Sequence, residues 1–202
     1  MNNNDLSVIS QVTDHIYLSG IYPLEKDSVG STNTISTLGI KYIVCCVGKD
    51  QASDIHDKII INYPYITVLY IPLDDIVQQN LWSSNKNAVT LKSKKLHTSK
   101  YHNLYKRKPM IEIGYHFINQ IVDSKDKVLV HCMAGISRSV SMVIYFLMKK
   151  YHLNFDDAID FVKRKRKIAN PNISFKLQLK LYHIKRDQFD EDDAKKIIQQ
   201  AL

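Results

Sequence analysis

The segment that most constrains the fold of this chain is the run His131-Cys132-Met133-Ala134-Gly135-Ile136-Ser137-Arg138-Ser139. The apolar residues 128–130 precede it and predict a buried strand, whereas apolar residues at helical spacing follow it. A strand, a short loop and a helix in that order are the repeating unit of α/β folds with a parallel sheet. The loop is therefore expected at the carboxyl end of a strand, where such folds bind ligands.

The residue types in this loop suit the transfer of a phosphoryl group to sulfur. Inward backbone N–H groups and the helix N-terminus form a cradle for an anion. Gly135 permits a positive φ, and Arg138 offers a planar fork that can hold two phosphoryl oxygens. Cys132 lies where each of these features favours an anion. We therefore expect its thiolate to attack phosphorus and form a covalent thiophosphate.

The other loop residues are expected to support this reaction. Ser139 can donate a hydrogen bond to the sulfur and ease its departure, and His131 is expected to order the loop through its imidazole. The predicted phosphate-binding residues are Met133, Ala134, Gly135, Ile136, Ser137 and Arg138. A buried cysteine near a glycine turn is the default interpretation of a lone cysteine, but the complete pattern in this context is far more specific.

The pattern His-Cys-x-x-Gly-x-x-Arg-Ser resembles the signature of the cysteine-dependent protein phosphatases, and Ala134 and Ser137 resemble its dual-specificity branch. Further segments resemble that family in the expected order, and they are residues 13–20, 38–44, 70–75 and 170–179. The resemblance implies the cysteine-phosphatase fold and hydrolysis of phosphotyrosine and phosphoserine or phosphothreonine through a cysteinyl-phosphate. It implies no metal and no cofactor, and a phosphoprotein as the substrate.

Two adjacent residues, Asp74 and Asp75, are candidates for the acid that protonates the leaving oxygen. Aligning Ile71-Pro72 with the family pattern places this acid at Asp75, with Asp74 as the alternative. An aspartate pair after proline also suits a solvated turn. Asn172 either braces the cysteine loop, as the resemblance implies, or caps a helix.

Hydrophobic periodicity predicts the remaining elements. Strands are predicted at 42–47, 66–71 and 127–131, and helices at about 111–122, 140–151, 155–162 and 175–182. These elements predict an α/β fold with a central, mainly parallel sheet flanked by helices. The length of 202 residues suits one catalytic domain at 13–186, with an N-terminal extension at 1–12 and a C-terminal helical extension at 187–202.

The connection from about Val77 to Pro109 departs from the family pattern because it is long, basic and free of acidic residues. It also holds Trp82, Tyr101 and Tyr105. We expect either a solvated, mobile insertion or a basic arm for an acidic partner. Single-stranded nucleic acid is a possible partner of such a segment, but nothing in the sequence supports it.

Three other features have mainly structural interpretations. Cys45 and Cys46 are expected to pack in the core, with a protective disulfide to Cys132 as the alternative. The basic run 163–167 is interpreted as a solvated helix face rather than a nuclear-import signal or anion patch. The histidines other than His131 show no metal-ligand spacing, so no metal site is predicted.

Composition and motifs indicate the cellular compartment in which the protein acts. Residues 1–5 do not resemble a secretory signal, and no apolar run approaches the roughly 18 residues of a transmembrane helix. Three cysteines without paired spacing and a working thiolate favour a reducing compartment, the cytoplasm or nucleus. The Lys-, Asn- and Ile-rich composition is typical of an AT-rich genome, and for a viral protein the setting would be the virion or host cytoplasm.

Three rival functions remain open. The same chemistry could act on phosphoinositides or RNA 5′-phosphates, although loops for phosphoinositides often carry Lys where this chain has Met133 and Ile136. A non-catalytic phosphoprotein-binding module typically lacks the nucleophile or the arginine, and this chain has both Cys132 and Arg138. A sulfurtransferase is disfavoured by the Arg-Ser ending of the loop.

Overall fold

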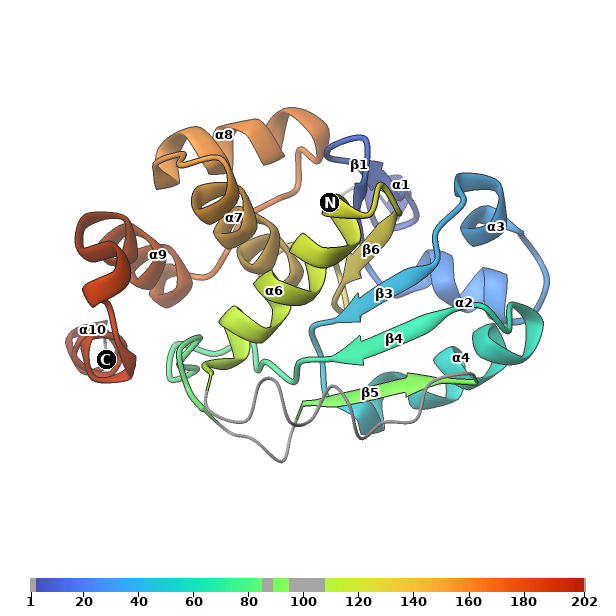
Figure 1. Ribbon diagram of the computed structural model, residues 1–202, viewed down its shortest axis with the longest axis horizontal. Coiled ribbons are helices and arrows are strands. Elements are labelled where there is room, and N and C mark those ends of the chain that lie inside the picture. The colour runs from blue at the N-terminus through green and yellow to red at the C-terminus, as the bar shows by residue number, and fades with distance from the viewer. Residues whose placement is uncertain (1–2, 85–88, 95–107, 202) are drawn as a thin grey trace.

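The apolar run before the cysteine loop forms the strand β6 (Val128–His131) inside a six-stranded sheet. The computed structural model describes residues 3–84, 89–94 and 108–201, and Figure 1 shows how their elements are arranged. The other strands are β1 (Ser10–Gln11), β2 (Ile16–Ser19), β3 (Tyr42–Cys45), β4 (Thr67–Tyr70) and β5 (Thr90–Ser93). Their order across the sheet is β1-β2-β6-β3-β4-β5.

The four inner strands run parallel, and each of the two edge strands runs antiparallel to its neighbour. In the register of the parallel strands, Ser19, His131, Cys45 and Tyr70 form one row across the sheet. This row lies at the carboxyl ends of the strands, so the loop that follows His131 begins at the edge where α/β folds bind ligands. The prediction of a mainly parallel sheet is confirmed.

Helices cover both faces of the sheet (Figure 1). They are α1 (Asn3–Leu6), α2 (Tyr22–Ser28), α3 (Thr34–Leu38), α4 (Lys49–Asn62), α6 (Met110–Asp123), α7 (Arg138–Lys150), α8 (Phe155–Lys165), α9 (Ile173–Lys185) and α10 (Glu191–Ala201), with a short 3-10 helix at Arg186–Gln188. Within the described ranges, no helix combines the length and apolar character needed to cross a bilayer.

The helix that follows the cysteine loop, α7, lies at the centre of the packing. Residues 139–148 of α7 are all buried. The helix contacts β2 and β6 of the sheet on one side and α6, α8 and α9 around the rest. Because strands and helices pack around α7, they also fix the position of the cysteine loop at its N-terminus.

The connection from Val77 to Pro109 enters the core in its first part. Leu81 and Trp82 are 0% and 2% exposed. The Trp82 ring packs edge-on against the rings of Tyr145 and Phe189, with centroids 5.5 and 4.5 Å apart. The expectation of a solvated insertion is wrong for these residues, because an indole buried in an aromatic cluster stabilises the core and is not free to stack on nucleic acid bases.

A later part of the same connection forms β5, which pairs with β4 at the edge of the sheet. Lys92 of β5 forms an ion pair with Asp57 of α4. This stretch is therefore part of the sheet and not a free loop. Residues 85–88 and 95–107, which hold most of the predicted basic arm, lie outside the described residues, so that arm stays a prediction.

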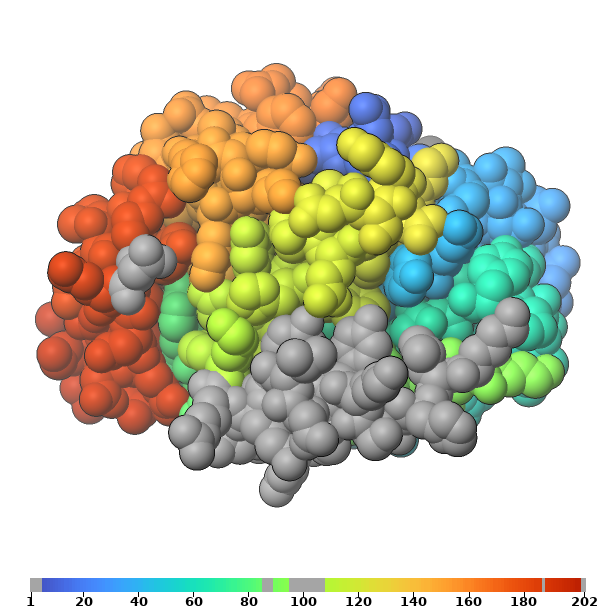
Figure 2. Space-filling model, in the orientation of Figure 1, coloured from blue at the N-terminus to red at the C-terminus, as the bar shows by residue number. Residues whose placement is uncertain are grey.

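Both ends of the described chain pack on the central part of the fold. Residues 10–11, which the sequence assigns to an N-terminal extension, add β1 to the sheet. At the other end α10 packs against α9 and buries Ala194 and Ile197. Figure 2 shows the C-terminal helices forming one continuous surface with the α7 and α8 region. The division of the chain at residues 13 and 187 stays a prediction.

Candidate active site

The loop between β6 and α7 is closely packed against the end of β2. Gly135 has a φ of 68°, the left-handed region that favours glycine. A Cβ at Gly135 would lie 2.4 Å from the carbonyl carbon of Ser19. Glycine is therefore required there for its backbone conformation, as the sequence predicts, and also for the close approach to β2.

The sulfur of Cys132 receives two hydrogen bonds at the base of this loop. The backbone N–H of Gly135 and the hydroxyl of Ser139 both donate to Sγ, each at 3.2 Å. Only 1% of Cys132 is exposed. Donors aimed at a sulfur stabilise its anionic form, so this arrangement supports the predicted roles of both Cys132 and Ser139.

Arg138 lies at the mouth of the loop with part of its hydrogen-bonding capacity unused. Its Nη1 donates to the carbonyl of Leu73 at 3.4 Å, and its Nε lies 3.8 Å from Oδ2 of Asp75. Among the described residues, the buried Nε has no hydrogen-bond partner. A buried donor without a partner costs free energy, and a phosphoryl oxygen would satisfy it.

Asp75, not Asp74, faces the cysteine loop. Its Oδ1 accepts hydrogen bonds from the hydroxyl of Ser137 at 2.6 Å and from Nδ2 of Asn172 at 3.0 Å. Asp74 is exposed, and its backbone N–H donates to Gln79, which suits the turn interpretation. The geometry thus supports Asp75 as the acid.

Asn172 makes contacts that suit both of the roles that the sequence left open. Its Oδ1 accepts from the backbone N–H of Phe175 and so caps α9, while its Nδ2 donates to Asp75. Its own backbone N–H donates to the hydroxyl of Ser137. One residue therefore joins a helix terminus, the cysteine loop and the acid loop.

Arg166 is a residue of the site that the sequence interpretation missed. The run 163–167 was expected to be a solvated helix face, but α8 ends at Lys165, and only 3% of Arg166 is exposed. Its Nε donates to the carbonyl of Gly135 at 2.6 Å, and its Nη2 donates to the carbonyl of Ala134 at 3.1 Å. The expectation is wrong for Arg166, which supports the cysteine loop from behind.

These two contacts orient the loop amides. The carbonyl of Ala134 and the N–H of Gly135 belong to one trans peptide and point in opposite directions. Because Arg166 fixes the carbonyl of Ala134 on its own side of the peptide, the N–H of Gly135 points to the opposite side, where it donates to Sγ of Cys132. The same relation holds for the carbonyl of Gly135 and the N–H of Ile136.

Replacing Arg166 with lysine is expected to lower kcat/KM for an aryl phosphate by roughly tenfold to a hundredfold, because lysine cannot hold both carbonyls at once. It should also lower the free energy of unfolding by about 2–3 kcal/mol, which thermal denaturation would measure. Arg164→Lys, on the exposed part of the same run, is the matched control and should change neither quantity. Equal effects of the two variants would contradict the assignment.

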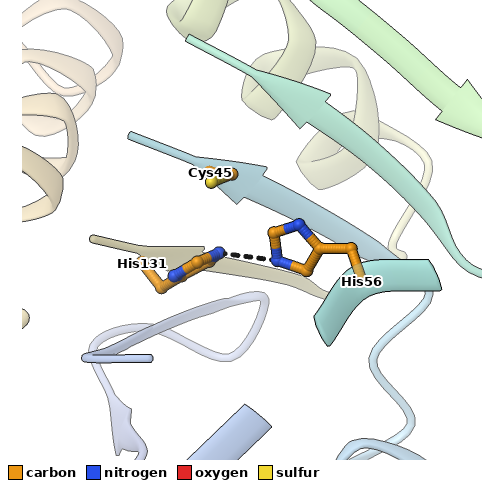
Figure 3. A group of neighbouring side chains, drawn as sticks. All are labelled: Cys45, His56 and His131. Atoms are coloured by element: carbon orange, nitrogen blue, oxygen red, sulfur yellow. Dashed lines mark hydrogen bonds between the residues drawn. The ribbon is translucent and has the colours of Figure 1, made fainter. Parts of the chain in front are cut away.

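One of the other cysteines and two histidines form a buried cluster beside the loop (Figure 3). Cys45, His56 and His131 come from β3, α4 and β6, and their metal-ligating atoms lie within 4.8 Å of one another. Sequence spacing could not reveal this cluster because its members are far apart in the chain. The two rings are hydrogen bonded to each other, Nε2 to Nε2 at 3.0 Å, so both are partnered without an ion.

All three cysteines are free thiols. Burial raises the pKa of Cys45 to about 12 and also raises the pKa of Cys46 well above its usual range. Both side chains therefore stay protonated and pack as small apolar groups, which supports the core interpretation. The disulfide alternative stays a prediction.

Comparisons with known proteins identify the family of this chain. Residues 21–185 match the family model described as dual specificity phosphatase, catalytic domain. R622 of Acanthamoeba polyphaga mimivirus, a relative named as a tyrosine-protein phosphatase, is 50% identical over 199 residues, which cover 96% of this chain and 92% of R622. Human dual specificity protein phosphatase 7 is 51% identical over 63 residues, 31% of this chain and 15% of that relative.

A solved structure shows the same fold at low sequence identity. Human DUSP28 superposes with a TM-score of 0.59 and 18% identity, covering 87% of this chain and 93% of its own. The family predicted from the run 131–139 is confirmed by the match over most of the chain. The chain belongs to the dual-specificity phosphatase family.

Proposed function

We propose that this protein hydrolyses phosphotyrosine and phosphoserine or phosphothreonine in proteins through a cysteinyl-phosphate on Cys132. The observation that carries the proposal is the convergence of three groups on one loop. A sulfur with two donors lies at its base, the partly unpartnered Arg138 guanidinium lies at its mouth, and the Asp75 carboxyl group contacts it through Ser137. These groups supply a nucleophile, an anion clamp and a proton donor.

In the first step the Cys132 thiolate attacks phosphorus, and the bond from phosphorus to the substrate oxygen breaks. Arg138 and the N–H groups of residues 133–138 bind the phosphoryl oxygens and stabilise their charge in the transition state. Asp75 gives its proton to the departing oxygen. Because Oδ1 of Asp75 already accepts two hydrogen bonds, the proton to be transferred is assigned to Oδ2.

In the second step water attacks phosphorus, and the bond to sulfur breaks. Asp75, now a carboxylate, takes a proton from the water, which restores its starting form. The sulfur leaves as a thiolate and keeps the hydrogen bonds from Ser139 and the N–H of Gly135. These donors are worth more as negative charge develops on the sulfur, so they accelerate this step.

Ser139→Ala is expected to slow hydrolysis of the cysteinyl-phosphate by roughly tenfold to a hundredfold, the worth of one hydrogen bond to a charged group. The phosphoenzyme should then accumulate during turnover, and rapid acid quenching followed by mass spectrometry would measure its fraction. Ser141→Ala is the matched control, since this buried hydroxyl of the same helix donates to a backbone carbonyl instead. The role would be refuted if the Ser139 variant showed no more phosphoenzyme than the control.

The proposed function is tested by hydrolysis of an aryl phosphate and of phosphotyrosine and phosphoserine peptides with a metal chelator present. We expect turnover of all three and an acid-stable phosphate on Cys132. Turnover that disappears with the chelator, or that leaves no phosphate on the protein, would overturn the mechanism. Release of phosphate only from inositol lipids or RNA 5′ ends would favour a phosphatase for phosphoinositides or RNA 5′-phosphates. Phosphopeptide binding without turnover would favour a non-catalytic binding module.

Several finer assignments belong to the same proposal. The catalytic domain is placed at residues 13–186, and the protein is placed in a reducing compartment, such as a host cytoplasm. The three free cysteines and the viral relative support that setting. We also propose that the segment 77–109 binds an acidic partner, but only through those of its basic residues that lie outside β5.

A further inference from the structure

Beneath the cysteine loop, a chain of hydrogen bonds joins side chains of β4, α4 and β6 to the backbone of Cys132. The Tyr70 hydroxyl lies 2.9 Å from Nδ1 of His56, and Nε2 of His56 lies 3.0 Å from Nε2 of His131 (Figure 3). Nδ1 of His131 lies 3.3 Å from the carbonyl oxygen of Cys132. Tyr70, His56 and His131 are each 0% exposed.

The ends of this chain fix the direction of every hydrogen bond in it. The carbonyl of Cys132 can only accept, so Nδ1 of His131 must carry the proton. A neutral imidazole has one N–H, so Nε2 of His131 accepts and Nε2 of His56 donates to it. Nδ1 of His56 is then an acceptor, and the Tyr70 hydroxyl donates to it. Each ring therefore has a single tautomer compatible with its neighbours.

Burial keeps all three groups neutral. It lowers the pKa of His56 to about 2 and that of His131 to about 4, and it raises the pKa of Tyr70. The proximity of the two rings also lowers the pKa of His56, because a charge on either ring would repel a charge on the other. No member of the chain is expected to change its charge at neutral pH.

We propose that His56 and Tyr70 are positioning residues that hold His131 in its Nδ1–H tautomer and thereby orient the peptide between Cys132 and Met133. This inference rests on the proposed function of the loop. In a trans peptide the N–H points away from the carbonyl. Fixing the carbonyl of Cys132 toward His131 therefore aims the N–H of Met133 in the opposite direction, into the phosphate cradle.

The direction of the hydrogen bonds strengthens this effect. Successive bonds that point the same way polarise one another. The donation that begins at Tyr70 therefore makes the last N–H, on His131, a better donor to the Cys132 carbonyl. A more polarised peptide carries more positive charge on its N–H, which binds a phosphoryl oxygen more strongly.

The direct test is the tautomer of His131, read from two-bond ¹H–¹⁵N correlations of its ring in the full-length labelled protein and assigned by its loss in His131→Gln. We expect a pure Nδ1–H form in the unmodified protein. In Tyr70→Phe and in His56→Leu the signals should move toward a mixture of the two neutral forms. Tyr145→Phe, which removes another buried hydroxyl, is the control and should leave the signals unchanged.

Kinetics provide the second readout. His56→Leu is expected to lower kcat for an aryl phosphate by roughly tenfold or more, because the loop amide is misaligned, and to change KM much less. His56→Gln should recover kcat to within about threefold, since the Gln amide N–H can donate to His131 in place of the ring. Tyr70→Phe should lie between these two.

The proposal is overturned if His131 in the unmodified protein is the Nε2–H form, or if its ring signals are the same in Tyr70→Phe, in His56→Leu and in the unmodified protein. It is also overturned if His56→Gln and His56→Leu lower kcat equally. If His56→Leu does not fold, the ring signals of His131 in Tyr70→Phe and in the unmodified protein still test whether the chain sets its tautomer. An unmodified protein without turnover would refute the proposed function, whereas the tautomer measurement would still test the hydrogen-bond chain.

Discussion

Replacing Cys132 with serine is expected to reduce turnover of an aryl phosphate by about 10⁴-fold or more, to near the limit of detection. A serine hydroxyl is not ionised at neutral pH, so the loop would lose its nucleophile while its donors remain in place. Arg138 and the backbone amides would still bind phosphate. We therefore expect the affinity for a peptide that carries a non-hydrolysable phosphotyrosine analogue to stay within a few-fold of that of the unmodified protein.

Initial rates and isothermal titration on one preparation would measure both quantities. Cys46→Ala is the matched control, because it removes a second fully buried thiol. This control should keep most of the activity. Residual turnover of the serine variant above about one part in a hundred, or a simultaneous loss of peptide binding, would contradict the role of Cys132.

The parts of the site that could be predicted from the sequence are those contained in short contiguous segments. The loop from His131 to Ser139 carries its own chemistry, and the strand before it and the helix after it are evident from local periodicity. The pairing of Asp75 with this loop could be inferred only from the order of family-like segments. The structure supports that inference through the contacts of Asp75 with Ser137 and Asn172.

The parts that the sequence did not reveal depend on contacts between distant residues. Arg166 is one of five consecutive basic residues, and nothing local separates a guanidinium that turns inward from four that face solvent. His56 lies 75 residues before His131, and the two side chains meet only because β3, which precedes the helix of His56, pairs with β6, which ends at His131. Trp82 and β5 were misjudged for the same reason, since a basic, loop-like composition does not show which residues the core will bury.

Asp75→Asn is expected to lower kcat for a phosphoserine peptide by roughly 10²–10⁴-fold, the contribution of a general acid. Asparagine has nearly the same shape, and its amide oxygen can still accept from Ser137 and Asn172, so the loop should keep these two contacts. What is lost is the proton on Oδ2 that the leaving oxygen needs. Steady-state rates with a series of phosphate esters of increasing leaving-group basicity would measure the effect.

The dependence on the leaving group distinguishes loss of an acid from general damage to the site. A nitrophenolate leaves readily without a proton, whereas a serine alkoxide does not, so the rate lost in Asp75→Asn should grow steadily with the basicity of the leaving oxygen. Asp74→Asn, one residue earlier and exposed, is the control and should lower every rate by less than about twofold. If Asp74→Asn showed the steep dependence and Asp75→Asn did not, the acid would be Asp74. If both variants lowered all esters equally, neither carboxylate would be the proton donor, and the contacts of Asp75 would serve only to order the loop.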